Sequence, residues 1–180
     1  MSVKNSNNES LRYPIGKFAF PDTFSEASIA GWINDISKLP EQLIQLVDGL
    51  SEAQLLLTYR EGGWNCIQLI NHLIDSHSNS IIRFKLALTE DYPTIRPYKE
   101  ELFALLADSM HAPVDQSLLL IKLMHARWVI LLNSIKKEEW ERKLFHPDSK
   151  RDFTLYQLLA LYAWHGKHHL AHIKLAQQNH

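Results

Sequence analysis

Four of the ten histidines in the sequence lie within eight residues of one another, near its C-terminal end. They form two pairs spaced four residues apart, His165 with His169 and His168 with His172. On a helix this spacing places both imidazoles of a pair on one face, where they can converge on a single metal ion. Gly166 follows His165, so the segment lacks the glutamate general base of an HExxH motif. The pattern therefore predicts a metal site, the alternative being histidines on the surface or hydrogen-bonded in a core.

The helical phase of the segment indicates which pair points inward. The apolar stripe of the predicted helix 155–176 consists of Leu155, Leu158, Leu159, Tyr162, Ile173 and Ala176. At about 100° per residue, His169 lies roughly 20° from the centre of this stripe and His165 roughly 60°. His172 lies roughly 80° away and His168 about 120°. The phase thus predicts that His165 and His169 face the interior and that His168 faces solvent.

A catalytic metal site needs a third protein ligand and at least one open position. The predicted helix 65–89 offers His72 and His77. Helical phase favours His77, which lies close to the centre of that helix's apolar stripe, whereas His72 lies well to the side. His125 on another helix and His146 in a loop are further candidates, so spacing alone leaves the third ligand open.

Four long helical patterns must position these histidines, at residues 25–50, 65–89, 114–135 and 155–176. Pro40 interrupts the first pattern, which predicts one kinked helix or two consecutive helices. Shorter elements are a turn at 51–57 opened by a Ser51–Gln54 capping box, a helix at 99–107 and a turn or small hairpin at 142–153. Amphipathic helices of this length bury their stripes most simply as an all-α four-helix bundle with short extra helices. The long connection between the second and third helices leaves the topology open.

The chain is predicted to form a single domain, residues 11–180, preceded by a disordered tail at 1–10. The tail is too polar to bury enough apolar area to offset its ordering entropy. Residues 11–24 combine aromatic residues with two prolines, which indicates an extended N-terminal arm and not a helix.

The overall composition excludes several classes of protein. The chain has 180 residues and a net charge of −1, so it lacks the basic footprint of a nucleic-acid-binding protein. Its one cysteine, Cys66, cannot form an internal disulfide. The first ten residues show no secretory signal, and no run of 18 apolar residues suggests a membrane span. We therefore expect a cytoplasmic protein without a membrane partner.

Several segments together resemble the YfiT branch of the DinB family. They include 59–77 (YREGGWNCIQLINHLIDSH), 79–90, 93–98, 127–128 and 162–173 (YAWHGKHHLAHI), with 13–16 near the start. The resemblance covers nearly the whole chain beyond residue 10. It implies a four-helix bundle, commonly dimeric, with one divalent metal ion held by three histidines. By motif these are His72, His165 and His169, so the family pattern replaces the His77 that phase favours; Asn71 stands where such sequences often carry a second histidine.

The resemblance implies two related activities. Some DinB-like proteins are thiol S-transferases that use low-molecular-weight thiols of the bacillithiol class, and the YfiT branch is described as metal-dependent hydrolases. A divalent ion with three histidine ligands, zinc or nickel, would lower the pKa of a bound thiol or water. We expect the transferase, because no carboxylate base accompanies the histidines; the alternatives are a hydrolase using hydroxide and a non-enzymatic helical module. Asp75, three residues from His72, is the one weak candidate for a base. Alternatively, Asp75 is an ordinary helix residue whose carboxylate is solvated.

Two further expectations concern Cys66 and assembly. Cys66 lies on the apolar stripe with Leu69 and Leu73, so we predict a packed side chain and not a nucleophile. A homodimer is expected from the resemblance and from the abundance of aromatic residues, with the arm from Tyr13 to Phe24 lying across the partner. The alternative is an arm that covers its own bundle in a monomer.

Overall fold

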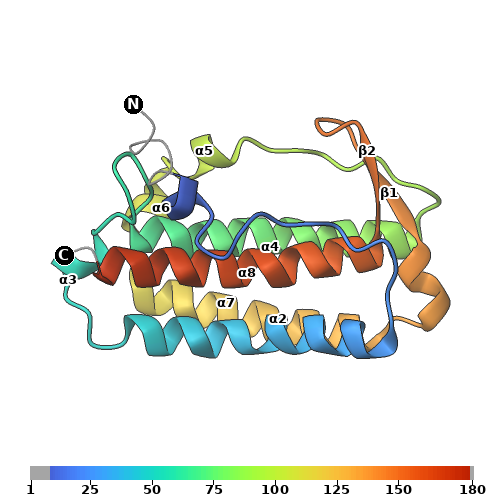
Figure 1. Ribbon diagram of the computed structural model, residues 1–180, viewed down its shortest axis with the longest axis horizontal. Helices are drawn as coiled ribbons and strands as arrows, with labels where there is room; N and C mark the ends of the chain where they lie inside the picture. The colour runs from blue at the N-terminus through green and yellow to red at the C-terminus, as the bar shows by residue number, and fades with distance from the viewer. Residues whose placement is uncertain (1–8, 179–180) are drawn as a thin grey trace.

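Four long helices lie side by side in the computed structural model, which describes residues 9–178 (Figure 1). They are α2 (Glu26–Val47), α4 (Cys66–Thr89), α7 (Val114–Ser134) and α8 (Leu155–Gln178). The shorter elements are α3 (Glu52–Leu55), α5 (Glu100–Phe103), α6 (Ala107–His111), the 3-10 helix η1 (Lys137–Glu141) and the strands β1 (Lys143–His146) and β2 (Arg151–Thr154). The predicted all-α four-helix bundle is therefore confirmed.

The helices do not alternate in direction. In Figure 1, α2 and α8 run towards one end of the bundle, while α4 and α7 both run towards the other. The connection from α4 to α7 runs back along the bundle and carries α5 and α6. It is anchored near its start to β1, where Phe145 donates to the Pro93 carbonyl and Ile95 donates to the Phe145 carbonyl. This long connection lets two consecutive long helices lie parallel.

Local sequence signals set most of the boundaries. The side chains of Ser51 and Gln54 form the predicted capping box at α3, and the predicted hairpin is the antiparallel pair β1–β2. Pro40 lies inside α2, which continues as one helix. The single helix predicted at 99–107 is instead two short helices, because the backbone is extended at Leu106 between α5 and α6.

The core consists of two apolar clusters with histidines between them. One cluster, towards the hairpin, includes Ile33, Phe84 and Trp128. The other, towards the end of α8, includes Leu43 and Leu69. The buried side chains of His77, His125 and His169 lie at intermediate positions along α4, α7 and α8. Such a layer has to be hydrogen-bonded or otherwise compensated, because burying unpaired polar groups costs free energy.

The N-terminal arm lies against its own bundle. Its aromatic residues pack on α8 and β2, with Phe24 at 4.9 Å from Tyr156 and Phe18 at 5.6 Å from Trp164, ring centroid to ring centroid. The Tyr156 hydroxyl also donates to the Asp22 carbonyl. The arm that is predicted to lie across a partner therefore contacts α8 and β2 of its own chain. Residues 1–8 of the predicted disordered tail lie outside the described part. Residues 9 and 10 form a helical turn with residues 11 and 12, which are predicted to be extended as the start of the arm.

Among the described helices, α7 alone is long and apolar enough to cross a membrane when judged by length and composition. It packs against α2 and α4 in the bundle. Its buried polar residues Ser117 and His125 are hydrogen-bonded to Asn71 and His77 of α4. Only 28% of its most apolar stretch is buried, so the packing leaves an apolar face of α7 exposed.

Candidate metal centre

Three histidine side chains point the same ring nitrogen, Nε2, towards one another. The Nε2 atom of His165 lies 3.1 Å from Nε2 of His72 and 3.1 Å from Nε2 of His169. Two nitrogens that each bind one zinc ion at about 2.0–2.1 Å lie about 3.0–3.4 Å apart. The donor set and its spacing therefore fit a divalent ion of the zinc class, bound by α4 and α8.

Burial keeps these imidazoles in the state that binds metal. It lowers the pKa of His72 to about 4, with a smaller contribution from the nearby His172. It also holds the pKa values of His165 and His169 well below the ordinary value, and neighbouring histidines add to the effect. All three rings are thus neutral at pH 7, and neutral imidazole is the metal-binding form.

His77, which helical phase favours as a ligand, does not belong to this trio. Its side chain is fully buried, with Nδ1 2.9 Å from Nε2 of His125 and Nε2 3.3 Å from Nδ1 of His165. Both ring nitrogens of His77 therefore face other histidines. His125 reaches the Ile36 carbonyl through its other nitrogen, at 2.8 Å. His146 lies at the end of β1 and is also outside the trio.

The prediction that His168 faces solvent is wrong. Its side chain is 7% exposed, stacked on Trp164 at 4.5 Å between ring centroids and approached by Tyr13 of the arm at 6.1 Å. Helical phase places His168 on the side of α8 away from the apolar stripe, which would be exposed to solvent if the arm did not cover it. His168, His169 and His172 form a second close group. In that group both nitrogens of His172 already face partners, the ring of His169 and the Arg12 carbonyl.

A pocket of about 690 Å³ opens onto the three converging nitrogens. Its wall includes the aromatic side chains Tyr13, Tyr59, Trp64 and Trp164. Trp64 packs on the His72 ring at 4.7 Å, and Tyr59 stacks on His172 at 3.9 Å. The turn between Tyr59 and Trp64 contains Gly62 at φ +65°, a backbone conformation that glycine adopts without strain. The glycine pair thus allows this turn to place two aromatic rings over the site.

Comparison with known proteins identifies the family. The sequence model of the DinB superfamily matches residues 35–173 of this chain. The chain belongs to the DinB superfamily. Relatives in Bacillus cereus (strain AH820) and Bacillus anthracis (strain A0248) carry the name "Putative metal-dependent hydrolase"; each is 49% identical over 163 residues, 91% of this chain and 93% of the relative.

A solved structure matches the fold as well as the sequence. It is YfiT from Bacillus subtilis, described as "a probable metal-dependent hydrolase with an unusual four-helix bundle topology". The two chains are 41% identical, with a TM-score of 0.92, and the match covers 94% of this chain and 97% of YfiT. The resemblance to the YfiT branch stated from the sequence is therefore confirmed.

Asn71, the departure from the family pattern, has a structural role in this DinB protein. Its side-chain oxygen accepts from the Ser117 hydroxyl of α7 at 2.7 Å, and its amide donates to the Ser109 carbonyl of α6 at 3.2 Å. Gln68 similarly donates to the Ala104 carbonyl after α5, at 2.8 Å. These bonds hold α5 and α6 against α4, beside the pocket.

Charged pocket residues are the part of the site that the sequence did not indicate. Glu100 and Glu101 line the pocket together with Arg12 and Arg60. Burial, and then the neighbouring Glu101, raise the pKa of Glu100. Asp75, the base candidate from the sequence, is half-buried and is not among the described residues that line this pocket. Burial and then Asp108 raise its pKa as well.

Gly166 explains why no glutamate accompanies the histidine pair. A Cβ atom at this position would come within 2.8 Å of the Leu39 side chain on α2. Leu39 is itself only 2% exposed, so it has little room to move. The position that holds the glutamate in an HExxH motif is used here for close packing between α8 and α2.

We predict that Cys66→Ala leaves activity and metal content unchanged. Cys66 is fully buried, and burial raises the pKa of its thiol, although the Gln177 amide donates to the sulfur at 3.4 Å and opposes this shift. The lost packing should lower the free energy of unfolding by about 1 kcal/mol. Assays, metal analysis and chemical denaturation check this. Loss of activity in a folded, metal-loaded Cys66→Ala protein would show that the thiol takes part in the reaction.

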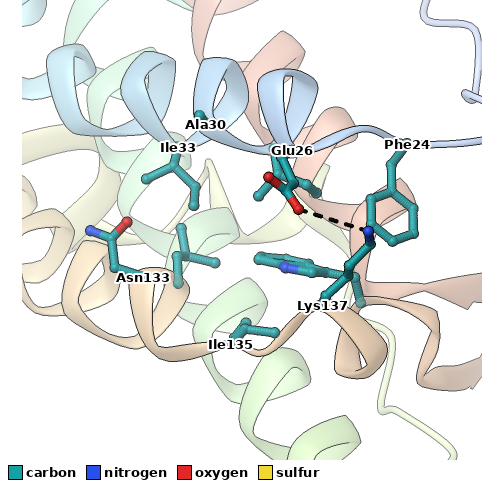
Figure 2. A pocket seen from close by; sticks show the side chains of 10 residues that line it. Phe24, Glu26, Ala30, Ile33, Asn133, Ile135 and Lys137 are labelled. Atoms are coloured by element: carbon teal, nitrogen blue, oxygen red, sulfur yellow. Dashed lines mark ion pairs between the residues drawn. The ribbon is translucent and has the colours of Figure 1, made fainter.

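A second cavity, of about 320 Å³, lies between the start of α2 and the end of α7 (Figure 2). Its walls are mainly apolar and include Ile33 and Trp140. Glu26 and Lys137 form an ion pair of 3.7 Å across its mouth, and both side chains are largely exposed. No histidine or cysteine is among its described lining residues, so it offers neither metal ligands nor a thiol nucleophile.

Proposed function

We propose that this chain is a metal-dependent transferase that adds a low-molecular-weight thiol to a small electrophile. The observation that carries the proposal is the set of three Nε2 atoms, from His72, His165 and His169, that faces the pocket of about 690 Å³. A zinc or nickel ion held there would act as a Lewis acid and lower the pKa of a bound thiol, making it a nucleophile at neutral pH.

The size and polarity of the pocket suit a thiol and a second small molecule. Ligand pockets commonly measure about 300–1,000 Å³, so a volume of about 690 Å³ is in the upper part of that range. Arg12 and Arg60 supply guanidinium donors that match a carboxylate on the thiol. The aromatic wall shields the reacting atoms from water, which favours transfer to the electrophile over side reactions.

A metal-dependent hydrolase is the second candidate. The names of the relatives favour it, and so does Glu100, a carboxyl group with a raised pKa in the same pocket. A carboxyl group whose pKa is moved towards neutrality suits proton transfer in hydrolysis. The metal would have the same role with water as with a thiol.

One paired screen separates the candidates. Zinc-loaded and nickel-loaded protein would be assayed with a panel of thiols and a chromogenic electrophile, beside chromogenic esters and amides. We expect thiol consumption that requires metal and stops with a chelator. Hydrolysis alone would favour the second candidate. Activity in neither assay, together with no bound metal, would indicate a non-enzymatic helical module.

The guanidinium role has its own test. Arg60→Ala should raise the KM for a carboxylate-bearing thiol by about tenfold, the cost of one charge-assisted hydrogen bond, while leaving the KM for its amide derivative unchanged. Arg96→Ala is the matched control, because Arg96 is exposed and outside the described lining of the pocket. Equal KM changes for both thiols would remove Arg60 from substrate recognition.

We further propose a homodimer that uses the exposed face of α7. Leu119, Leu120, Leu123 and Ile130 are between 52% and 73% exposed and lie within about a third of the helix circumference. Monomeric proteins seldom expose a contiguous apolar patch of this kind, and two-fold contacts are the commonest way to cover one. The arm is occupied with its own bundle, which leaves the helices for this contact.

Light scattering at micromolar concentration checks the dimer. We expect twice the 20.9 kDa of the chain, and a mass close to 20.9 kDa for the double variant Leu123→Glu, Ile130→Glu. Burying two carboxylates per protomer would cost more desolvation free energy than the contacts of a typical interface can offset. Lys122→Glu, at an exposed position of the same helix, should stay dimeric. A monomeric unmodified chain would refute the assembly.

A further inference from the structure

All four long helices contribute to one hydrogen-bonded row across the middle of the bundle. The row begins at the Ile36 carbonyl of α2 and passes to Nδ1 of His125 on α7, at 2.8 Å. It continues from Nε2 of His125 to Nδ1 of His77 on α4, at 2.9 Å. It ends where Nε2 of His77 faces Nδ1 of His165 on α8, at 3.3 Å. His77 and His125 are 0% and 1% exposed, and apolar side chains could fill these positions without desolvating a polar ring.

The carbonyl at the start of the row determines where each proton lies. A carbonyl oxygen only accepts, so Nδ1 of His125 carries a hydrogen, and neutral imidazole has only one N–H. Nε2 of His125 must then accept from Nδ1 of His77, and Nε2 of His77 must accept from Nδ1 of His165. The lone pair of His165 is thereby placed on Nε2, the atom that faces His72 and His169.

A second, shorter row does the same for His169. The Arg12 carbonyl of the arm accepts from Nε2 of His172 at 3.3 Å. Nδ1 of His172 must therefore accept from Nδ1 of His169, also at 3.3 Å. This places the lone pair of His169 on Nε2.

The two rows leave two lone pairs, on Nε2 of His165 and Nε2 of His169, facing each other at 3.1 Å. Such an arrangement is repulsive unless a cation or an N–H donor lies beside the nitrogens. In the metal-free chain Nε2–H of His72, 3.1 Å from Nε2 of His165, is such a donor. A carbonyl cannot pass a proton onward, so the rows hold tautomers and are not routes for proton transfer. We propose that His77, His125 and His172 are positioning residues that lock His165 and His169 as Nε2 metal ligands, with backbone carbonyls as the fixed ends. This inference rests on the metal site of the proposed function.

Nitrogen-15 NMR of the metal-free, unmodified chain tests the tautomers directly. We expect the Nδ1–H form at His77, His125, His165 and His169, and the Nε2–H form at His172. The opposite tautomer at His165 or His169 would overturn the proposal. Because no metal is present, this result is independent of whether the chain has transferase or hydrolase activity.

Two variants of His125 test the consequence for metal binding. His125→Leu keeps a side chain in the core but ends the row, so His77 loses its acceptor. His125→Gln keeps the row, because its amide donates to the Ile36 carbonyl and its oxygen accepts from His77. Loss of a partner behind a metal-binding histidine typically costs about 10–100-fold in affinity.

The readout is the zinc Kd, measured by competition with a chelator at constant pH on variants with native circular dichroism. We expect a Kd about 10–100-fold higher for His125→Leu and within about threefold of the unmodified chain for His125→Gln. Equal affinity in all three proteins would overturn the positioning role. If His125→Leu does not fold, the tautomers measured in the unmodified chain alone test the positioning role. An unmodified chain that shows the expected tautomers but no metal binding would refute the proposed function and not the two rows.

Discussion

His165→Ala and His169→Ala are each expected to reduce bound metal from about one ion per chain to below a tenth and to abolish metal-dependent activity. Each substitution removes one of three converging Nε2 donors and leaves two, too few for a stable site of the zinc class. His72→Ala should behave in the same way. Elemental analysis of protein purified without a His-tag measures the effect, and circular dichroism confirms folding.

Two control variants make this result specific to the trio. His77→Gln should keep most of the metal at saturating concentration, because His77 faces His165 and not the centre of the trio. His111→Ala changes an exposed histidine of α6 and should have no effect. Full metal content in His165→Ala and His169→Ala would refute the assignment. If His77→Ala lost the metal and His72→Ala kept it, the ligands would instead be His77, His165 and His169, the set that helical phase favours.

The helices, and two of the three histidines whose ring nitrogens converge, are predictable from the sequence because they depend on local periodicity. The apolar stripe of α8 fixes the orientation of that helix, and the stripe alone selects His165 and His169 over His168 and His172. Phase indicates which side of a helix carries the apolar stripe, however, and not whether a residue on that side faces an opening. On α4 it therefore selected His77, which is 0% exposed, over His72, which is 4% exposed and lines the pocket.

The rest of the site depends on segments that carry no periodic signal. His168 is buried because Tyr13 of the arm lies over it, and the path of an extended arm is not encoded in helical phase. Glu100 enters the pocket because the α4–α7 connection returns along the bundle, where Gln68 anchors it after α5. Glu100 and Glu101 therefore supply carboxylates beside the histidines, so the ground on which the sequence favours a transferase, the lack of such a carboxylate, does not hold.

The metal-free protein is expected to unfold on mild acidification, with a transition between pH 6.5 and pH 4. Burial lowers the pKa values of His72, His125, His168 and His172 to about 4 in the folded chain, from an ordinary value of 6.5. Between these two values the unfolded chain binds more protons than the folded chain, so the free energy of unfolding falls as the pH falls. At pH 5 each such group lowers the free energy of unfolding by about 2 kcal/mol relative to pH 8, and the four together lower it by several kcal/mol. That total is comparable with the whole stability of a domain, about 5–15 kcal/mol.

Chemical denaturation at a series of pH values, with a chelator present, measures this slope. His125→Gln removes one of the titrating groups and should make the slope shallower, whereas His111→Gln, at an exposed position, should not change it. Bound zinc should move the transition to lower pH, because protons must displace the ion before its ligands can be protonated. Equal stability of the metal-free protein at pH 5 and pH 8 would show that the buried histidines are already compensated as cations, which contradicts the lone-pair arrangement at the centre of the site.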